Sequence, residues 1–158
     1  MKKSSIILIV IAVIAVIWGI SAYNGLVTMD ENVNTEWANV ETQYQRRADL
    51  IPNLVNTVKG YAAHESETLE SVIAARSKAT QIAIDPANLT PEKLAEYQEA
   101  QGAVTSALGK LLAISESYPD LKANQNFLEL QAQLEGTENR INEARRKFNN
   151  IAKEYNTA

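Results

Sequence analysis

The sequence contains no cysteine and only one histidine, His64. Without cysteine the chain forms no disulfide, offers no thiolate to a metal and carries no lipid-modified N-terminal cysteine. Protein zinc sites need several nitrogen or sulfur ligands, and one histidine supplies a single ligand. We therefore predict no metal centre and no cofactor.

Glycine and basic charge are also scarce, with 6 glycines in 158 residues and a net charge of −4. The chain has no Gly-rich phosphate loop and no Gly-x-Ser-x-Gly elbow. His64-Glu65 does not begin a zinc-peptidase motif, because Thr68 stands where the second histidine is needed. Nucleic-acid binding would require a basic face. We expect neither an enzyme nor a nucleic-acid partner.

A long uncharged segment is present at the N-terminus, where residues 4–29 carry no charge and residues 6–20 are apolar throughout. About 20 apolar residues suffice to cross a bilayer as a helix. We predict a single-pass membrane anchor in residues 1–25 that contacts lipid, followed by one domain in 26–158. The anchor residues are Ile6, Ile11, Ile14, Trp18 and Tyr23. The alternative is a cleaved signal peptide, although its apolar core would be unusually long.

The orientation of this anchor is predicted from the basic residues beside it. Lys2 and Lys3 precede the span, whereas Asp30 and Glu31 follow it. Basic residues favour the cytoplasmic side, so we expect the domain to lie outside the cytoplasm. Arg46 and Arg47, about 20 residues beyond the span, weaken this bias.

The domain has no β-branched alternation and reads as all-α. Apolar residues recur at three- and four-residue steps in four segments, 26–62, 66–83, 90–118 and 119–156, which predicts an elongated antiparallel four-helix bundle with coiled-coil-like packing. The second segment is too short to return fully toward the membrane. We therefore expect part of an apolar stripe near the membrane to stay open, and such an opening needs a partner or self-association. The stripe is formed by Val33, Trp37, Val40, Phe148, Ile151 and Tyr155.

Arg47 and Pro52 are unusual residues for the long first helix. Pro52 either kinks a continuous helix or lies in the first turn of a helix that restarts at Asp49. Arg47 falls on the apolar seam, where a charge is costly unless it is paired. Glu138 and Glu143 are the candidate partners; the alternative is that Arg47 reaches solvent along its alkyl stem.

Two turns should meet at the end of the bundle far from the membrane. They carry Lys59, Tyr61, His64 and Glu65 in the first turn, and Tyr118 and Asp120 in the second. Tyrosines among mixed charges are suited to protein recognition, so these six residues form a candidate partner patch. Ordinary turn chemistry, with Tyr118 and Leu121 stapling the last helix, is the alternative.

Four ordered blocks resemble the bacterial LemA family: residues 46–65, beginning Arg46-Arg47-Ala48-Asp49-Leu50-Ile51-Pro52-Asn53, residues 23–27, residues 117–124 and residues 134–141. The resemblance implies a membrane-anchored four-helix bundle without an established reaction. Family members are often encoded beside membrane peptidases or small envelope proteins, and one branch is associated with magnetosome membranes. The resemblance also implies a segment containing Phe-Pro and an apolar tail after Tyr155-Asn156, whereas this sequence ends at Ala158.

These features predict a scaffold or accessory protein of the cell envelope that binds a membrane or envelope protein, or a second copy of itself. The alternative is a sensor or ligand-binding module that signals through the membrane helix. That alternative predicts a polar pocket between helices, near Arg47, Gln101 and Thr137 on the seams.

Overall fold

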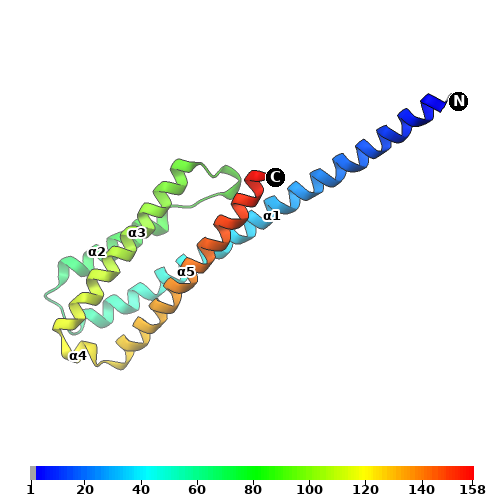
Figure 1. Cartoon of the computed structure of the whole chain (residues 1–158). Helices are drawn as coiled ribbons and strands as arrows, with labels where there is room; N and C mark the ends of the chain where they lie inside the picture. The colour runs from blue at the N-terminus through cyan, green and yellow to red at the C-terminus, as the bar shows by residue number, and fades with distance from the viewer. Residues whose placement is uncertain (1–2) are drawn as a thin grey trace.

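The computed structural model describes residues 3–158 and contains no strand within them. The elements are α1 (Lys3–Lys59), α2 (Ser66–Gln81), η1 (Pro86–Asn88), α3 (Pro91–Ile114), η2 (Ser115–Ser117), α4 (Pro119–Lys122) and α5 (Gln125–Thr157). The four longer helices form an antiparallel bundle, and the N-terminal part of α1 extends beyond it alone (Figure 1). The predicted all-α class and elongated four-helix bundle are confirmed.

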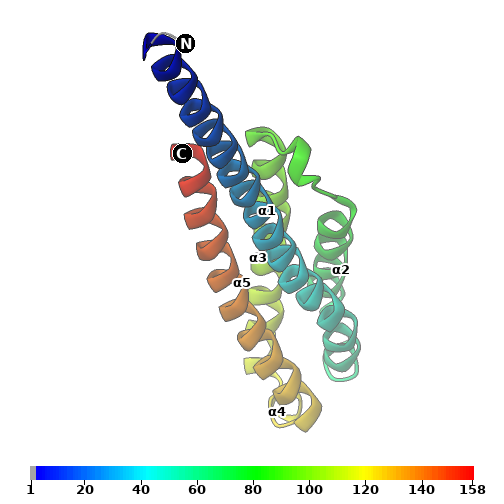
Figure 2. The same cartoon turned by 90° about the vertical axis from the view of Figure 1, so that its right-hand side faces the viewer.

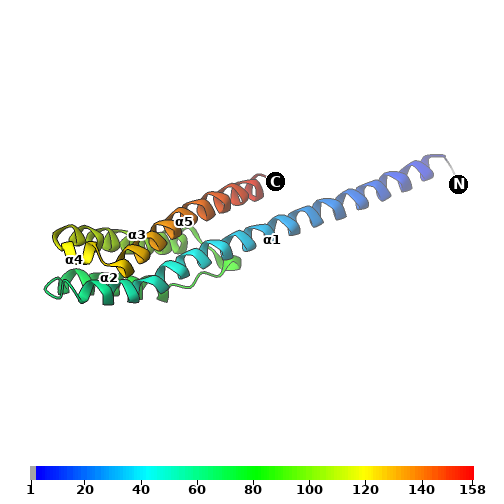
Figure 3. The same ribbon diagram turned by 90° about the horizontal axis from the view of Figure 1, so that it is seen from below.

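Helix α1 joins the apolar N-terminal segment to the bundle without a break. Its large apolar side chains between Ile6 and Val27 are all exposed, whereas Trp37 and every seam residue that follows it to Val58 are buried. Helix α5 returns alongside α1, so the C-terminus lies beside the middle of α1 (Figures 1 and 3). Helix α1 thus exposes apolar side chains at its N-terminal end and packs into the bundle core at its C-terminal end.

Helix α1 also continues through Pro52. Proline has no N–H, so the carbonyl of Ala48, four residues earlier, loses its helical donor. The Nε of Arg76 in α2 donates a hydrogen bond to this carbonyl oxygen at 2.7 Å. Asp49 does not begin a new helix; it accepts a hydrogen bond from Gln45, one turn earlier, at 2.8 Å. The continuous-helix alternative is therefore the one the structure adopts.

Side-chain caps set the start of the later helices. Thr90 Oγ1 accepts from the Lys93 amide at 3.3 Å, and Pro91 occupies the first turn of α3, in agreement with the predicted helical segment 90–118. The predicted start of the last helix at 119 was wrong. A short helix ends at Lys122, and Asn124 Oδ1 then accepts from the Phe127 amide at 2.9 Å to begin α5.

The core consists of two clusters along the bundle. The distal cluster, far from the apolar segment, includes Ile51, Leu54, Leu111, Phe127 and Leu134. The proximal cluster consists of Trp37, Val40, Tyr44, Ile84, Tyr97, Ile141 and Phe148. Helices α1 and α5 pack side by side along both clusters (Figure 2).

The apolar stripe that was expected to be partly open near the membrane is open at one end and covered over the rest of its length. Trp37, Val40 and Phe148 are buried, and Val33 and Ile151 are half-buried. Tyr155 alone of the six remains exposed. The stripe is covered because α3 begins at Pro91, near this end of the bundle, and its Tyr97 packs on Trp37 with ring centroids 5.4 Å apart. The sequence pattern did not reveal that residues 82–90 carry the chain back this far.

Candidate functional site

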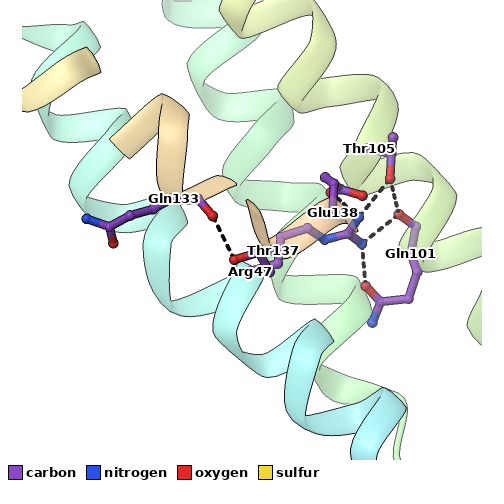
Figure 4. Close-up of polar contacts among 6 residues, drawn as sticks. All are labelled: Arg47, Gln101, Thr105, Gln133, Thr137 and Glu138. Atoms are coloured by element: carbon purple, nitrogen blue, oxygen red, sulfur yellow. Dashed lines mark hydrogen bonds and ion pairs between the residues drawn. The ribbon is translucent and has the colours of Figure 1, made fainter. Parts of the chain in front are cut away.

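The centre of the bundle holds a polar layer around Arg47, whose side chain is 2% exposed (Figure 4). Its Nη1 donates to Thr105 Oγ1 at 2.7 Å and to Glu138 Oε1 at 2.8 Å. Its Nη2 donates to the backbone oxygen of Gln101 at 2.9 Å and to the Gln101 Oε1 at 2.6 Å. Arg47 therefore does not reach solvent, and it ties α1 to both α3 and α5.

The surroundings of this layer favour a charged guanidinium held in one position. The Arg47 guanidinium carbon lies 5.1 Å from the centroid of the Tyr44 ring, within the range of a cation–π contact. Burial raises the pKa of Tyr44 and the pKa of Tyr97, so both phenols stay neutral at physiological pH. Arg47 and Glu138 are the ionised groups in direct contact within the layer.

Glu143, the second candidate partner of Arg47, is exposed and forms an ion pair with Arg146 one turn along α5. The structure thus brings Arg47 together with Glu138 and not with Glu143. Thr137, also on the seam, is buried and donates to the Gln133 backbone oxygen of its own helix at 2.8 Å (Figure 4).

The six residues of the candidate partner patch lie at the distal tip. Glu65 Oε1 accepts from the Tyr118 hydroxyl at 3.1 Å, which joins the two turns. The Tyr61 hydroxyl accepts from Asn124 Nδ2 at 2.9 Å, while the Tyr61 side chain is 42% exposed. Lys59, His64 and Asp120 are exposed beside them. The tip is therefore cross-linked yet keeps an aromatic face accessible.

The five anchor residues, Ile6, Ile11, Ile14, Trp18 and Tyr23, are all exposed on the solitary part of α1. Within the described residues, α1 is the one helix long and apolar enough to cross a membrane. The charged residues that follow are partly tied to α5. Glu36 Oε1 lies 2.7 Å from Lys147 Nζ, and this hydrogen bond lowers the pKa of the Glu36 carboxyl.

A cleft of about 640 Å³ opens between α1, α2 and α3 beside the Arg47 layer. Glu41, Arg47, Arg76, Tyr97 and Gln101 are among the residues that line it. The sequence pattern did not point to Arg76, Glu36 or Glu41 as functional residues. A proline four residues after Ala48 was the available signal that a donor such as Arg76 is needed.

Residues 3–158 contain no group of three or more His, Cys, Asp or Glu side chains placed to hold a metal ion. Comparison with known protein families places the chain in one of them. The LemA family model matches residues 36–158, which include the Arg47 layer, the tip and all of α5. The chain belongs to the LemA family.

Three relatives show which proteins resemble this family member in sequence. It is 29% identical over 153 residues to the magnetosome protein MamQ of Magnetospirillum gryphiswaldense, covering 86% of this chain and 56% of that protein. It is 28% identical to magnetosome protein MamQ 2 of Paramagnetospirillum magneticum, covering 94% and 62%. It is 27% identical to protein LemA of Metamycoplasma hominis, covering 75% and 50%. This LemA-family chain spans about half to three fifths of its relatives' lengths.

Proposed function

We propose that this LemA-family chain is a non-catalytic scaffold or accessory protein of the bacterial envelope. The N-terminal part of α1 anchors it in the lipid bilayer as a single span, and the bundle lies on the extracytoplasmic side. The observation that carries the proposal is the unbroken course of α1 from its exposed apolar segment into the bundle core. From Val27 to Lys59, the helix is about 50 Å long.

The distal tip is the surface that we propose contacts the partner. A rigid helix holds this tip at a fixed height above the membrane, where Tyr61 is exposed and its turn is tied to α5 through Asn124. Aromatic side chains on a preordered surface bind partners at low entropic cost. The partner is a membrane or envelope protein, or a second copy of the chain.

Photocrosslinking in intact cells tests this proposal. A photoreactive residue at Tyr61 should capture one recurrent membrane protein, or the chain itself, whereas the same residue at the exposed position Lys78 of α2 should not. A Tyr61→Ala/His64→Ala double substitution should abolish co-purification of the captured protein. It should lower the melting temperature only slightly, because the hydrogen bond that it removes, from Asn124 to the Tyr61 hydroxyl, is exposed. Co-purification that survives the double substitution would refute the tip as the partner surface.

A second candidate function is sensing, and the cleft between α1, α2 and α3 favours it. Helix α1 forms one wall of the cleft and is also the helix with the apolar segment. A ligand that shifts α1 relative to α2 would move the span as one body. This alternative predicts a polar pocket near Arg47, Gln101 and Thr137; the cleft supports it at Arg47 and Gln101, whereas Thr137 lies outside the lining.

A further inference from the structure

The cleft arises because α2 is shorter than its neighbours. Helix α2 ends at Gln81, while α1 and α3 continue toward the apolar segment, and residues 82–90 leave the gap between them open. Its volume of about 640 Å³ lies within the range of small-molecule sites. Ile51, Ala79, Ile82 and Val104 provide apolar walls.

Arg76 supplies a preoriented cation at one end of the cleft. Its Nε is held by the Ala48 carbonyl that Pro52 leaves without a donor. Its two terminal nitrogens have no hydrogen bond or ion pair within residues 3–158, whereas those of Arg47 have four hydrogen bonds. A guanidinium fixed through Nε presents the other two nitrogens as a fork that matches a carboxylate.

Glu41 supplies an anion at the other end. It is half-buried and forms no ion pair within residues 3–158. Burial raises the pKa of its carboxyl, and a bound ammonium group would oppose that effect. Three other charged residues line the cleft. Arg47 is buried and its terminal nitrogens already donate four hydrogen bonds, whereas Arg46 and Asp49 are exposed, so water screens them.

The spacing of the two anchor points along α1 sets the scale of the ligand. Glu41 precedes Ala48, the anchor point of Arg76, by seven residues, which is about 10 Å along the helix axis. An extended peptide of three residues also spans about 10 Å. A single amino acid is shorter than this spacing.

We propose that the cleft binds a short peptide of about three residues, with its carboxylate on Arg76 and its amino group on Glu41. This site would be the ligand site of the sensing function proposed above. Only the signal across the membrane depends on that function. Binding itself does not depend on whether the chain acts as a scaffold. Pro52 thereby gains a role beyond packing, because it frees the carbonyl that orients Arg76.

The experiment measures binding of trialanine to the full chain in detergent micelles by isothermal titration calorimetry. Trialanine amide lacks the carboxylate and N-acetyl-trialanine lacks the ammonium, and each should bind about tenfold more weakly or worse. Arg76→Gln should weaken trialanine by a similar factor and abolish the difference between trialanine and its amide. Arg140→Gln, an exposed arginine outside this cleft, should change nothing.

Three results would overturn the site: no saturable binding of trialanine, equal binding of the three peptides, or full binding by Arg76→Gln. If Arg76→Gln does not fold, the Pro52→Ala/Arg76→Gln variant replaces it, because the backbone amide that alanine restores at this position can then satisfy the Ala48 carbonyl. Crosslinking from Tyr61 in the Arg76→Gln variant separates the proposals. Retained capture with lost peptide binding would show that the tip functions independently of the cleft.

Discussion

The cores of the distal and proximal halves of the bundle are filled by different kinds of side chain. In the distal half, four helices lie within reach of one another and aliphatic residues fill the core, with Phe127 as its one aromatic side chain. In the proximal half α2 is missing, and Trp37, Tyr44, Tyr97 and Phe148 fill the wider space. Trp37 packs edge-on against Phe148 with ring centroids 5.1 Å apart. Bulky rings thus substitute for an absent helix.

The Arg47 layer separates these two halves. Ile51 and Leu134 lie on its distal side, and Tyr44 and Ile141 lie on its proximal side. A buried guanidinium with four hydrogen bonds fits only one register of α1 against α3 and α5. The layer therefore specifies how the aromatic and aliphatic halves are aligned.

The largest effect is expected in the distal half. Phe127→Ala should lower the free energy of unfolding by about 3–5 kcal/mol, because Phe127 is fully buried and its loss leaves a cavity. Urea unfolding of the full chain in detergent micelles measures this change. Leu128→Ala is the matched control, since Leu128 is 43% exposed and its loss should cost less than about 0.5 kcal/mol.

Removing the boundary between the halves should have the next largest effect. Arg47→Met should cost about 3 kcal/mol, because it leaves Gln101 and Glu138 without their donor. Glu138→Gln should cost about 1 kcal/mol, since the Glu138 side chain is 34% exposed and an amide oxygen can still accept from Arg47. Equal losses for both variants, measured by urea unfolding, would contradict a register set by Arg47.

A double-mutant cycle tests the coupling of Pro52 and Arg76 through the Ala48 carbonyl, on the distal side of this boundary. With Pro52 present, Arg76→Leu should cost about 1–3 kcal/mol, because the Ala48 carbonyl loses its donor. In a Pro52→Ala background the cost should fall below about 0.5 kcal/mol, because the new amide bonds that carbonyl. Thermal unfolding of the four proteins gives the coupling energy. A coupling energy near zero would show that Arg76 does not replace the donor that Pro52 removes from the Ala48 carbonyl.

The smallest effect is expected from the proximal ion pair between Glu36 and Lys147. Hydrogen bonding to Lys147 lowers the pKa of Glu36 in the folded chain, so the pair stabilises the fold above the unfolded pKa of about 4.5. This contribution is lost as the pH falls through the lower, folded pKa. Lys147→Met should therefore cost less than about 1 kcal/mol at pH 7 and nothing at pH 2. If Lys147→Met is still less stable than the unsubstituted chain at pH 2, the ion pair with Glu36 is not the source of the stabilisation.

Helical periodicity in the sequence predicted the bundle segments of α1 and α5 and the place of Arg47 on the apolar seam, but it did not reveal the break before Gln125 or decide whether α1 continues through Pro52. The caps at Thr90 and Pro91 similarly predicted the start of α3. The covering of Trp37 by Tyr97 could not be predicted, because it depends on the path of residues 82–90, which have no periodic pattern. The donor for the Ala48 carbonyl was also hidden, since Arg76 lies 28 residues away and only the packing of α2 brings it close.

The continuity of α1 from the membrane span to the tip is tested most directly by measuring a distance along this helix in a lipid nanodisc. The chain has no cysteine, so Ala22→Cys/Lys59→Cys places two spin labels cleanly for pulsed dipolar spectroscopy. A continuous helix predicts one narrow distribution at about 55 Å, and the control pair Asn34→Cys/Lys59→Cys predicts one at about 38 Å. A broad or shorter distribution for the first pair alone would place a hinge between the membrane span and the bundle, and would contradict the rigid presentation of the tip.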